Sequence, residues 1–301
     1  MFHSFQEIER SLLDSSRRVR IALAGAHDAD ALSALVAAQR KGVAQGVLIG
    51  RTADTAGLLR EMGEDPAQWQ LTEEADDARA ASLACGMVKE GMADIPMKGI
   101  LPTAVFMRAI LDKACGFVPD KGMLSQATVL EVPGENRLMI VSDCAVNITP
   151  SYEEKLKILK NAVALAHSLG IECPRAAVVT PVEVINPAMP STVDAAMLSK
   201  AQQRGQITGC IVDGPLALDN AVSAAAAAHK GIVSDVAGRA DILLMPDLCA
   251  GNIFTKSLTY LAHLPTAGTL CGTTSPVVMT SRTDSPEDKY HAILVAAARV
   301  D

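Results

Sequence analysis

Aromatic residues make up only 3% of this 301-residue chain, although apolar residues of all kinds reach 49%. The core must therefore be filled mainly by Ala, Val, Leu, Ile and Met. No apolar stretch is long enough and free enough of polar residues to span a bilayer, and the first residues lack the basic-then-apolar pattern of a signal peptide. We therefore expect a cytoplasmic chain with no membrane partner, long enough for two domains or one large α/β unit.

The chain also lacks a basic block or tail, and its formal net charge is −7. A protein that binds nucleic acid needs a basic surface, so this charge balance argues against nucleic acid as a partner. It does not exclude an anionic small molecule, because a local basic pocket is enough to bind one.

Metal-ligand spacing is missing as well. The seven cysteines are scattered without a C-x-x-C pair, and the six histidines form neither H-x-x-x-H nor H-E-x-x-H, so we expect reduced thiols and no metal site. Cys144 has no paired base that the sequence can name, which favours an inert core residue over a nucleophile. G-x-G-x-x-G, G-x-x-x-x-G-K-[ST] and G-x-S-x-G motifs are absent too.

Short apolar runs alternate with helical patterns along the whole chain, which predicts parallel sheets covered by helices. The expected strands are residues 19–24, 47–49, 69–71, 95–98, 129–132, 138–141, 176–179, 210–212, 242–245, 267–271 and 277–279. The expected helices are residues 8–13, 28–41, 52–62, 73–90, 103–112, 152–169, 192–204, 219–230, 252–262 and 290–300. Residues 129–132 and 138–141 flank Pro-Gly-Glu-Asn, a hairpin signal.

Short loops near residues 121–122 and 273–276 are the best candidates for domain boundaries. They predict a terminal α/β domain of residues 1–125 plus 276–301 and an inserted α/β domain of residues 126–275.

The stretch from Ser281 to Asp288 connects a predicted strand to a predicted helix. Free backbone N–H groups and the positive end of a helix dipole favour an anion at such a junction, and Arg282 adds a cation that holds phosphate through two hydrogen bonds. Helix capping by Ser285 explains part of the same stretch, but it does not explain Ser281 and Arg282. Lys98, at the end of another strand, suits either anion binding or solvation.

Four stretches together resemble the phosphate acetyltransferase and phosphate butyryltransferase family, and the resemblance covers nearly the whole chain in order. The stretches are residues 98–108, residues 143–147, residues 246–252 with Lys256, and residues 281–288. Lys98-Gly99, residues 186–190 and residues 213–217 resemble the butyryltransferase branch more closely.

The resemblance implies a reversible reaction in which acyl-CoA and phosphate give acyl phosphate and CoA. It implies two α/β domains with a cleft between them, similar to the isocitrate and isopropylmalate dehydrogenase fold. It also implies a homodimer or larger homo-oligomer, coenzyme A as a substrate and no cofactor.

The family's residue roles transfer position by position. Arg282 and Ser281 match the residues that hold phosphate, and Asp288 matches the aspartate that takes the proton of the CoA thiol. The remaining positions expected to bind substrate are Lys98, Thr103, Arg108, Asn147, Asn252 and Ser285.

One departure from the family concerns residues 283–284, where many members have Gly-Cys and this chain has Thr283-Asp284. Asp284 places a second carboxylate near the phosphate. Either Asp284 or Ser285 could therefore cap the helix, and either Asp284 or Asp288 could act as the base. Two other functions stay open: a nicotinamide-dependent dehydrogenase on the same fold, and a non-catalytic binding module.

Overall fold

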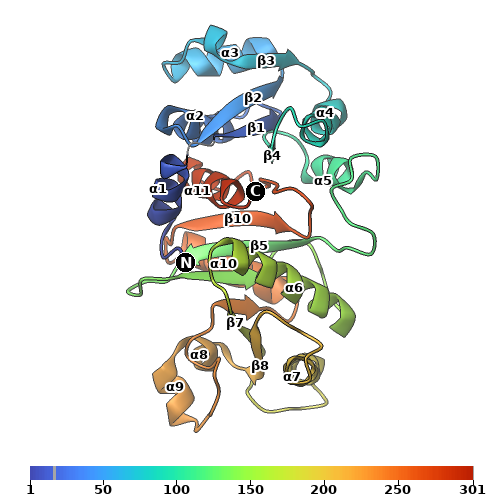
Figure 1. The fold of residues 1–301 in the computed structure, drawn as a ribbon, viewed down its shortest axis with the longest axis vertical. Helices are drawn as coiled ribbons and strands as arrows, with labels where there is room; N and C mark the ends of the chain where they lie inside the picture. The colour runs from blue at the N-terminus through green and yellow to red at the C-terminus, as the bar shows by residue number, and fades with distance from the viewer. Residues whose placement is uncertain (16–17, 301) are drawn as a thin grey trace. The chain divides into compact units, whose positions relative to one another are not determined.

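The computed structural model describes residues 1–15 and 18–300 and has two compact α/β units (Figure 1). One unit, here called the central unit, comprises Met1–Ser4 and Met123–Leu264, and the other, the terminal unit, comprises Phe5–Gly122 and Pro265–Asp301. In this division the central unit ends at Leu264 and the chain re-enters the terminal unit at Pro265. The predicted boundary lies later, at residue 276. The predicted domains also include Ser16, Arg17 and Asp301, which lie outside the described residues.

The sheet of the terminal unit has the strand order β3-β2-β1-β4, with β1 Val19–Ala24, β2 Ala44–Gly50, β3 Gln70–Glu73 and β4 Ile95–Lys98. All of its strand pairs are parallel, as the uninterrupted apolar runs predict. Every residue of β4 is buried, so its carboxyl end brings Lys98 into the interior of the unit.

Helices α1 Phe5–Asp14, α2 Ala29–Lys41, α3 Thr52–Glu61, α4 Asp77–Lys89, α5 Thr103–Leu111 and α11 Pro286–Ala297 belong to the same unit, with strand β10 Thr266–Cys271 and a short 3₁₀ turn at Pro66–Gln68. Helix α2 begins after Asp28 and ends at Gly42, as predicted; Gly42 adopts the left-handed conformation (φ 85°). The helix expected from residue 73 begins only at Asp77, because Asp76 caps it.

Residues 277–279 do not form the expected strand. They make only isolated bridges, a parallel one between Val278 and Met97 and an antiparallel one between Val277 and Leu270. A segment this short has room for only one bridge on each side, so it lacks a continuous ladder. Its bridges nevertheless place the residues that precede Arg282 beside the end of β4.

The central unit contains strands β5 Ser125–Glu131, β6 Leu138–Ser142, β7 Arg175–Val179, β8 Ile211–Leu216 and β9 Ile242–Leu244, neighbours in the order β5-β6-β9-β7-β8. Strands β5 and β6 pair antiparallel, which confirms the hairpin, and the remaining pairs of this series are parallel. Its helices are α6 Tyr152–Ser168, α7 Pro190–Gln203, α8 Leu218–Val222, α9 Ala224–His229 and α10 Leu248–Tyr260.

Three predictions for the central unit were wrong. The expected helix of residues 219–230 is two short helices, because Ser223 is extended (φ −120°, ψ 113°) and its side chain accepts the Ala226 N–H as the cap of α9. Helix α10 begins at Leu248 rather than at residue 252, because Asp247 caps it. The strand expected at residues 210–212 is longer than predicted, because β8 continues to Leu216.

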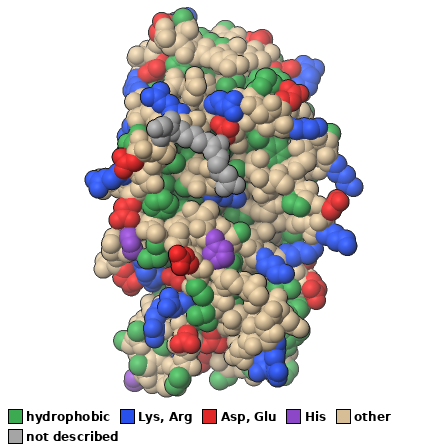
Figure 2. Space-filling view, in the orientation of Figure 1, with side chains coloured by type: hydrophobic (Ala, Val, Ile, Leu, Met, Phe, Trp, Pro, Cys, Tyr) green, Lys and Arg blue, Asp and Glu red, His purple; other side chains and the backbone are tan. Residues whose placement is uncertain are grey.

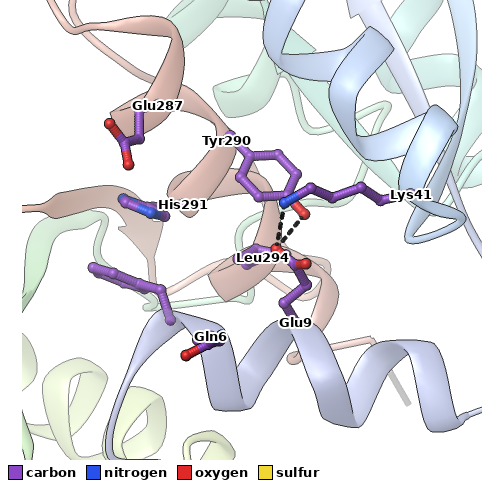
Figure 3. A pocket seen from close by; sticks show the side chains of 8 residues that line it. Gln6, Glu9, Lys41, Glu287, Tyr290, His291 and Leu294 are labelled. Carbon is purple, nitrogen blue, oxygen red and sulfur yellow. Dashed lines mark hydrogen bonds and ion pairs between the residues drawn. The ribbon is translucent and has the colours of Figure 1, made fainter.

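Helix α1 packs on α11 around a cavity of about 340 Å³ (Figure 3). At this cavity the carboxylate of Glu9 accepts hydrogen bonds from the Lys41 ammonium and the Tyr290 hydroxyl, both at 2.8 Å. The ring of His291 stacks on Phe5 with centroids 4.2 Å apart. These contacts fix one side of α11, the helix whose first turn carries Asp288.

Acidic and basic side chains are interspersed on the face shown in Figure 2. Within residues 1–15 and 18–300, no helix is both long and apolar enough to cross a membrane.

Candidate active site

Ser285 caps helix α11, which settles the question of the cap left open by the sequence. Its hydroxyl oxygen accepts the Asp288 N–H at 3.0 Å, and Pro286 occupies the first helical position. Asp284 instead turns back on its own loop, where its carboxylate accepts the Ser281 N–H at 2.7 Å. The Ser281 hydroxyl lies 3.1 Å from that of Thr283. Arg282 therefore projects from a loop closed by short-range hydrogen bonds, and its side chain is exposed.

The Asp288 carboxylate is held by three donors. One oxygen accepts the Thr266 backbone N–H at 2.9 Å and the Thr266 hydroxyl at 3.2 Å, and the other accepts the Ser285 hydroxyl at 2.7 Å. Because a carboxylate has about four acceptor positions, these bonds orient the group and leave about one position open. An oriented carboxylate with a remaining acceptor position is suited to take a proton.

Lys98 is the last residue of β4, and its side chain is only 3% exposed. Its backbone N–H donates to the Val278 carbonyl at 3.0 Å, and its ammonium donates to the Gly99 carbonyl at 3.2 Å. The turn that follows depends on glycine, because a Cβ at Gly99 would lie 2.3 Å from the Gly25 carbonyl oxygen. Because Lys98 is buried, the alternative that its side chain is solvated is wrong.

Burial lowers the pKa of Lys98, and the positive charge of Arg282 lowers it further. Asp28 raises the pKa, Lys289 lowers it and Asp284 raises it, each by a smaller amount. The ammonium of Lys98 thus experiences two other cations, and their repulsion exceeds the compensation from the two carboxylates. This corner of the terminal unit is an electropositive site.

Three lysines of the described chain are buried, and they differ in their partners. Lys155 in the central unit forms an ion pair with Asp194 at 2.6 Å. Among the described residues neither Lys98 nor Lys289 forms an ion pair, and their ammonium groups donate to the backbone carbonyls of Gly99 and Asp284. A buried charge without a counterion is costly, and an anionic ligand removes that cost. The terminal unit therefore has the features of an anion-binding site.

Two more of the predicted substrate-binding residues lie on α5. Thr103 is the first residue of this helix and is exposed, as expected of a helix start that can face a ligand. Arg108 is exposed and donates from Nε to the Ala104 carbonyl at 3.2 Å, on its own helix. Its other donors remain available for a ligand.

Asn147 and Asn252 belong to the central unit, where each makes a bond within the protein. The Asn147 amide donates to the Leu124 carbonyl at 2.9 Å and to the carboxylate of Asp143. The Asn252 amide donates to the Cys144 carbonyl at 3.1 Å. The Asn252 bond connects α10 to the segment after β6, and the Asn147 bonds connect that segment to Leu124 and to its own Asp143, so both asparagines brace this part of the fold.

Cys144 behaves as the sequence suggested. Its thiol is buried and donates to the Val141 carbonyl, and desolvation raises its pKa to about 12. A thiol with such a pKa stays protonated at neutral pH and is a poor nucleophile. No group of three or more potential metal-ligating side chains occurs in the part of the chain that the structure describes.

Two residues of the site were missed at the sequence level. Thr266 holds Asp288 from the start of β10, a contact across 22 positions that no local pattern indicates. Lys289 follows the acidic residues Glu287 and Asp288 and therefore resembles a residue of a solvated helix start. The residues after it give a signal, since Ala292 to Ala297 are all apolar, and a helix that is apolar on every side lies in the core.

The chain as a whole matches an established enzyme family. The model of the family described as "Phosphate acetyl/butaryl transferase" matches residues 71–297. The chain belongs to this family, as its four characteristic stretches suggested.

Curated relatives cover nearly the full length. The chain is 44% identical over 297 residues to the phosphate butyryltransferase of Clostridium acetobutylicum, covering 99% of this chain and 98% of the relative. It is 41% identical over 278 residues to the phosphate acetyltransferase of Thermotoga maritima, covering 92% and 94%.

A solved structure agrees with this assignment. A branched-chain phosphotransacylase from Enterococcus faecalis V583 superposes with a TM-score of 0.83 at 31% identity, covering 94% of this chain and 99% of that one. The fold and the family assignment therefore agree over almost the entire chain.

Proposed function

We propose that this chain interconverts a short-chain acyl-CoA and phosphate with acyl phosphate and CoA. The observation that carries the proposal is the buried ammonium of Lys98, which lacks an ion pair among the described residues and interacts electrostatically with Arg282. Phosphate supplies the missing negative charge. The names of the relatives, phosphate butyryltransferase and phosphate acetyltransferase, support the same reaction.

In the direction of acyl-CoA synthesis, the CoA sulfur attacks the carbonyl carbon of the acyl phosphate. A tetrahedral intermediate forms and then collapses as the carbon–oxygen bond to phosphate breaks, and phosphate leaves with the electron pair. Arg282 holds the phosphoryl group through two parallel hydrogen bonds, and Ser281 adds a hydroxyl beside it. Lys98 stabilises the negative charge that collects on the departing phosphate.

Asp288 accepts the proton of the CoA thiol in this scheme. A thiol of ordinary pKa, about 8.5, is mostly protonated at neutral pH, so a positioned base increases the fraction that reacts. Thr266 and Ser285 orient the Asp288 carboxylate for this role. We assign the base to Asp288 rather than Asp284, because the Asp284 carboxylate already braces the Ser281 backbone.

Further expectations complete the proposal. We propose that the substrates contact Thr103, Arg108, Asn147 and Asn252. We also propose that coenzyme A is a substrate and that the reaction needs no cofactor. Finally, we propose that the chain forms a homo-oligomer. A dehydrogenase-like fold is supported by the 4-hydroxythreonine-4-phosphate dehydrogenase of Klebsiella pneumoniae, which superposes with a TM-score of 0.58 at 13% identity. That likeness concerns the fold alone.

The test is the release of free CoA. The protein is mixed with acetyl-, propionyl- or butyryl-CoA, with and without inorganic phosphate, and thiol is followed with a disulfide dye. We expect phosphate-dependent release with at least one acyl-CoA, and the ranking of rates reports the preferred chain length. Equal release with and without phosphate for all three substrates would show that the transferase assignment is wrong.

A further inference from the structure

Lys289 is a second buried lysine beside the proposed phosphate site, and nothing in the reaction as described uses it. It lies in the first turn of α11, next to Asp288, and its side chain is only 2% exposed. Its ammonium donates to the backbone carbonyl of Asp284. A neutral carbonyl compensates a buried charge only in part, so the position of Lys289 requires an explanation.

The bond to Asp284 fastens the loop that carries Arg282. At its other end, the Asp284 carboxylate accepts the Ser281 N–H at 2.7 Å, so Asp284 connects both ends of this loop. The Lys289 backbone N–H also donates to the Ser285 carbonyl at 3.0 Å, within the first turn of α11. Lys289 therefore ties the Arg282 loop to a helix that is buried almost throughout.

Lys289 also contributes charge. Its ammonium is one of the groups that lower the pKa of Lys98, after burial and Arg282. Asp28 and Asp284 oppose this effect. In a buried site such a charge acts over several ångströms with little screening, so it adds to the positive potential at Lys98.

We propose that Lys289 is a positioning residue of the phosphate site, which holds the Arg282 loop through the Asp284 carbonyl and adds a fixed positive charge to the surroundings of Lys98. This inference rests on the proposed function, because it assumes that Arg282 and Lys98 bind phosphate. It assigns Lys289 no contact with the reacting atoms.

The test compares Lys289→Met and Lys289→Gln with the unaltered protein in the CoA-release assay. We expect the KM for phosphate to rise about tenfold or more, the size expected when a hydrogen bond to a charged group is lost, with a smaller change in kcat. Phosphate affinity should fall at high pH, when Lys98 loses its proton. We expect this fall to occur at a higher pH in the Lys289 variants, because without a neighbouring cation Lys98 keeps its proton up to a higher pH. A purely structural role for Lys289 would not move this pH profile.

Lys155→Gln is the matched control, since Lys155 is a buried helical lysine of the central unit. It removes an ion pair and lowers stability, and we expect its KM for phosphate to stay within twofold of the original. Folded Lys289 variants with an unchanged KM and pH profile would overturn the inference. If Arg282→Ala also leaves the KM unchanged, the placement of phosphate at Arg282 fails. If CoA release does not depend on phosphate even in the unaltered protein, the proposed function itself fails, so these failures are distinguishable from a failure of the inference about Lys289.

A measurement on the unaltered protein covers the case in which Lys289 variants do not fold. Lysine side chains labelled with ¹³C at Cε are followed by NMR while inorganic phosphate is added, with Lys155 as the internal reference. We expect the Lys98 and Lys289 signals to shift together and saturably, while the Lys155 signal stays constant. A shift of the Lys98 signal without one of the Lys289 signal would overturn the inference.

Discussion

The backbone N–H of Lys98 donates to the carbonyl oxygen of Val278 at 3.0 Å. The Val278 N–H in turn donates to the Pro96 carbonyl at 3.1 Å, and these two bonds form the bridge between Met97 and Val278 that joins the end of β4 to the segment leading into Arg282. Two cations that are 184 positions apart in the sequence thereby come close enough for the charge of Arg282 to lower the pKa of Lys98. The proposed phosphate site depends on this junction.

The assignment of the base is tested by Asp288→Asn and Asp284→Asn. Asparagine preserves size but cannot take up a proton, so we expect Asp288→Asn to lower kcat by about 10² to 10⁴, the range typical of general acid–base catalysis. Asp284→Asn weakens the brace on Ser281 and removes a carboxylate that raises the pKa of Lys98, but it leaves Asp288 in place, so we expect a change in kcat of less than tenfold. Initial rates at saturating substrate measure both values. The reverse order would assign the base to Asp284.

Lys98→Met tests the cost of the buried ammonium. We expect the variant to be more stable than the original protein without ligand, by about 1 to 3 kcal/mol at neutral pH, because methionine fills the space without a buried charge. Its KM for phosphate should rise at the same time. Urea denaturation of both proteins measures the free energy of unfolding. A loss of stability with unchanged KM would mean that Lys98 is a structural residue.

The lowered pKa of Lys98 also gives the sign of a pH effect. Burial and Arg282 favour the neutral form of Lys98, so the folded chain binds this proton less tightly than the unfolded chain does. At a pH below the folded-state pKa of Lys98, this difference lowers the free energy of unfolding. Phosphate binding needs the ammonium form. We therefore expect the KM for phosphate to increase with pH from a value below about 10.4, the ordinary pKa of lysine. An unchanged KM up to that pH would contradict this role.

Glu9→Gln tests how α1 holds α11. Burial alone would raise the pKa of Glu9, but hydrogen bonds from Lys41 and Tyr290 outweigh it, and the net pKa is lowered. A carboxylate of this kind stabilises the fold above its ordinary pKa of about 4.3 and loses that contribution as the pH falls through the lowered value. We expect Glu9→Gln to cost about 1 kcal/mol at pH 7. Denaturation at several pH values should show the difference disappearing below pH of about 4, whereas a constant difference would assign it to packing.

Much of the fold could be predicted from the sequence, because its elements have clear local ends. The helix predicted at residues 28–41 is confirmed as Ala29–Lys41, since a capping side chain at Asp28 and a left-handed glycine at Gly42 are both local signals. Ser223 was missed, because an alanine-rich run around it fits a continuous helix and only the observed backbone reveals the break.

The site was predicted less completely, because its connections are long-range. Ser285, Pro286 and Arg282 are recognisable from their neighbours alone. The contact of Thr266 with Asp288 depends on how β10 lies beside α11, which short-range patterns do not encode. The burial of Lys98 likewise depends on the pairing of Met97 with Val278, and the sequence left its exposure open.

The measurement that tests the central claim most directly is the dependence of the CoA-release rate on phosphate concentration in Arg282→Ala. The exposed Arg60 at the end of α3 provides the matched control, Arg60→Ala. We expect Arg282→Ala to raise the KM for phosphate about 10- to 100-fold, as expected for the loss of a bidentate charged hydrogen bond, and Arg60→Ala to leave it unchanged. Equal KM values for Arg282→Ala and the original protein would contradict the account.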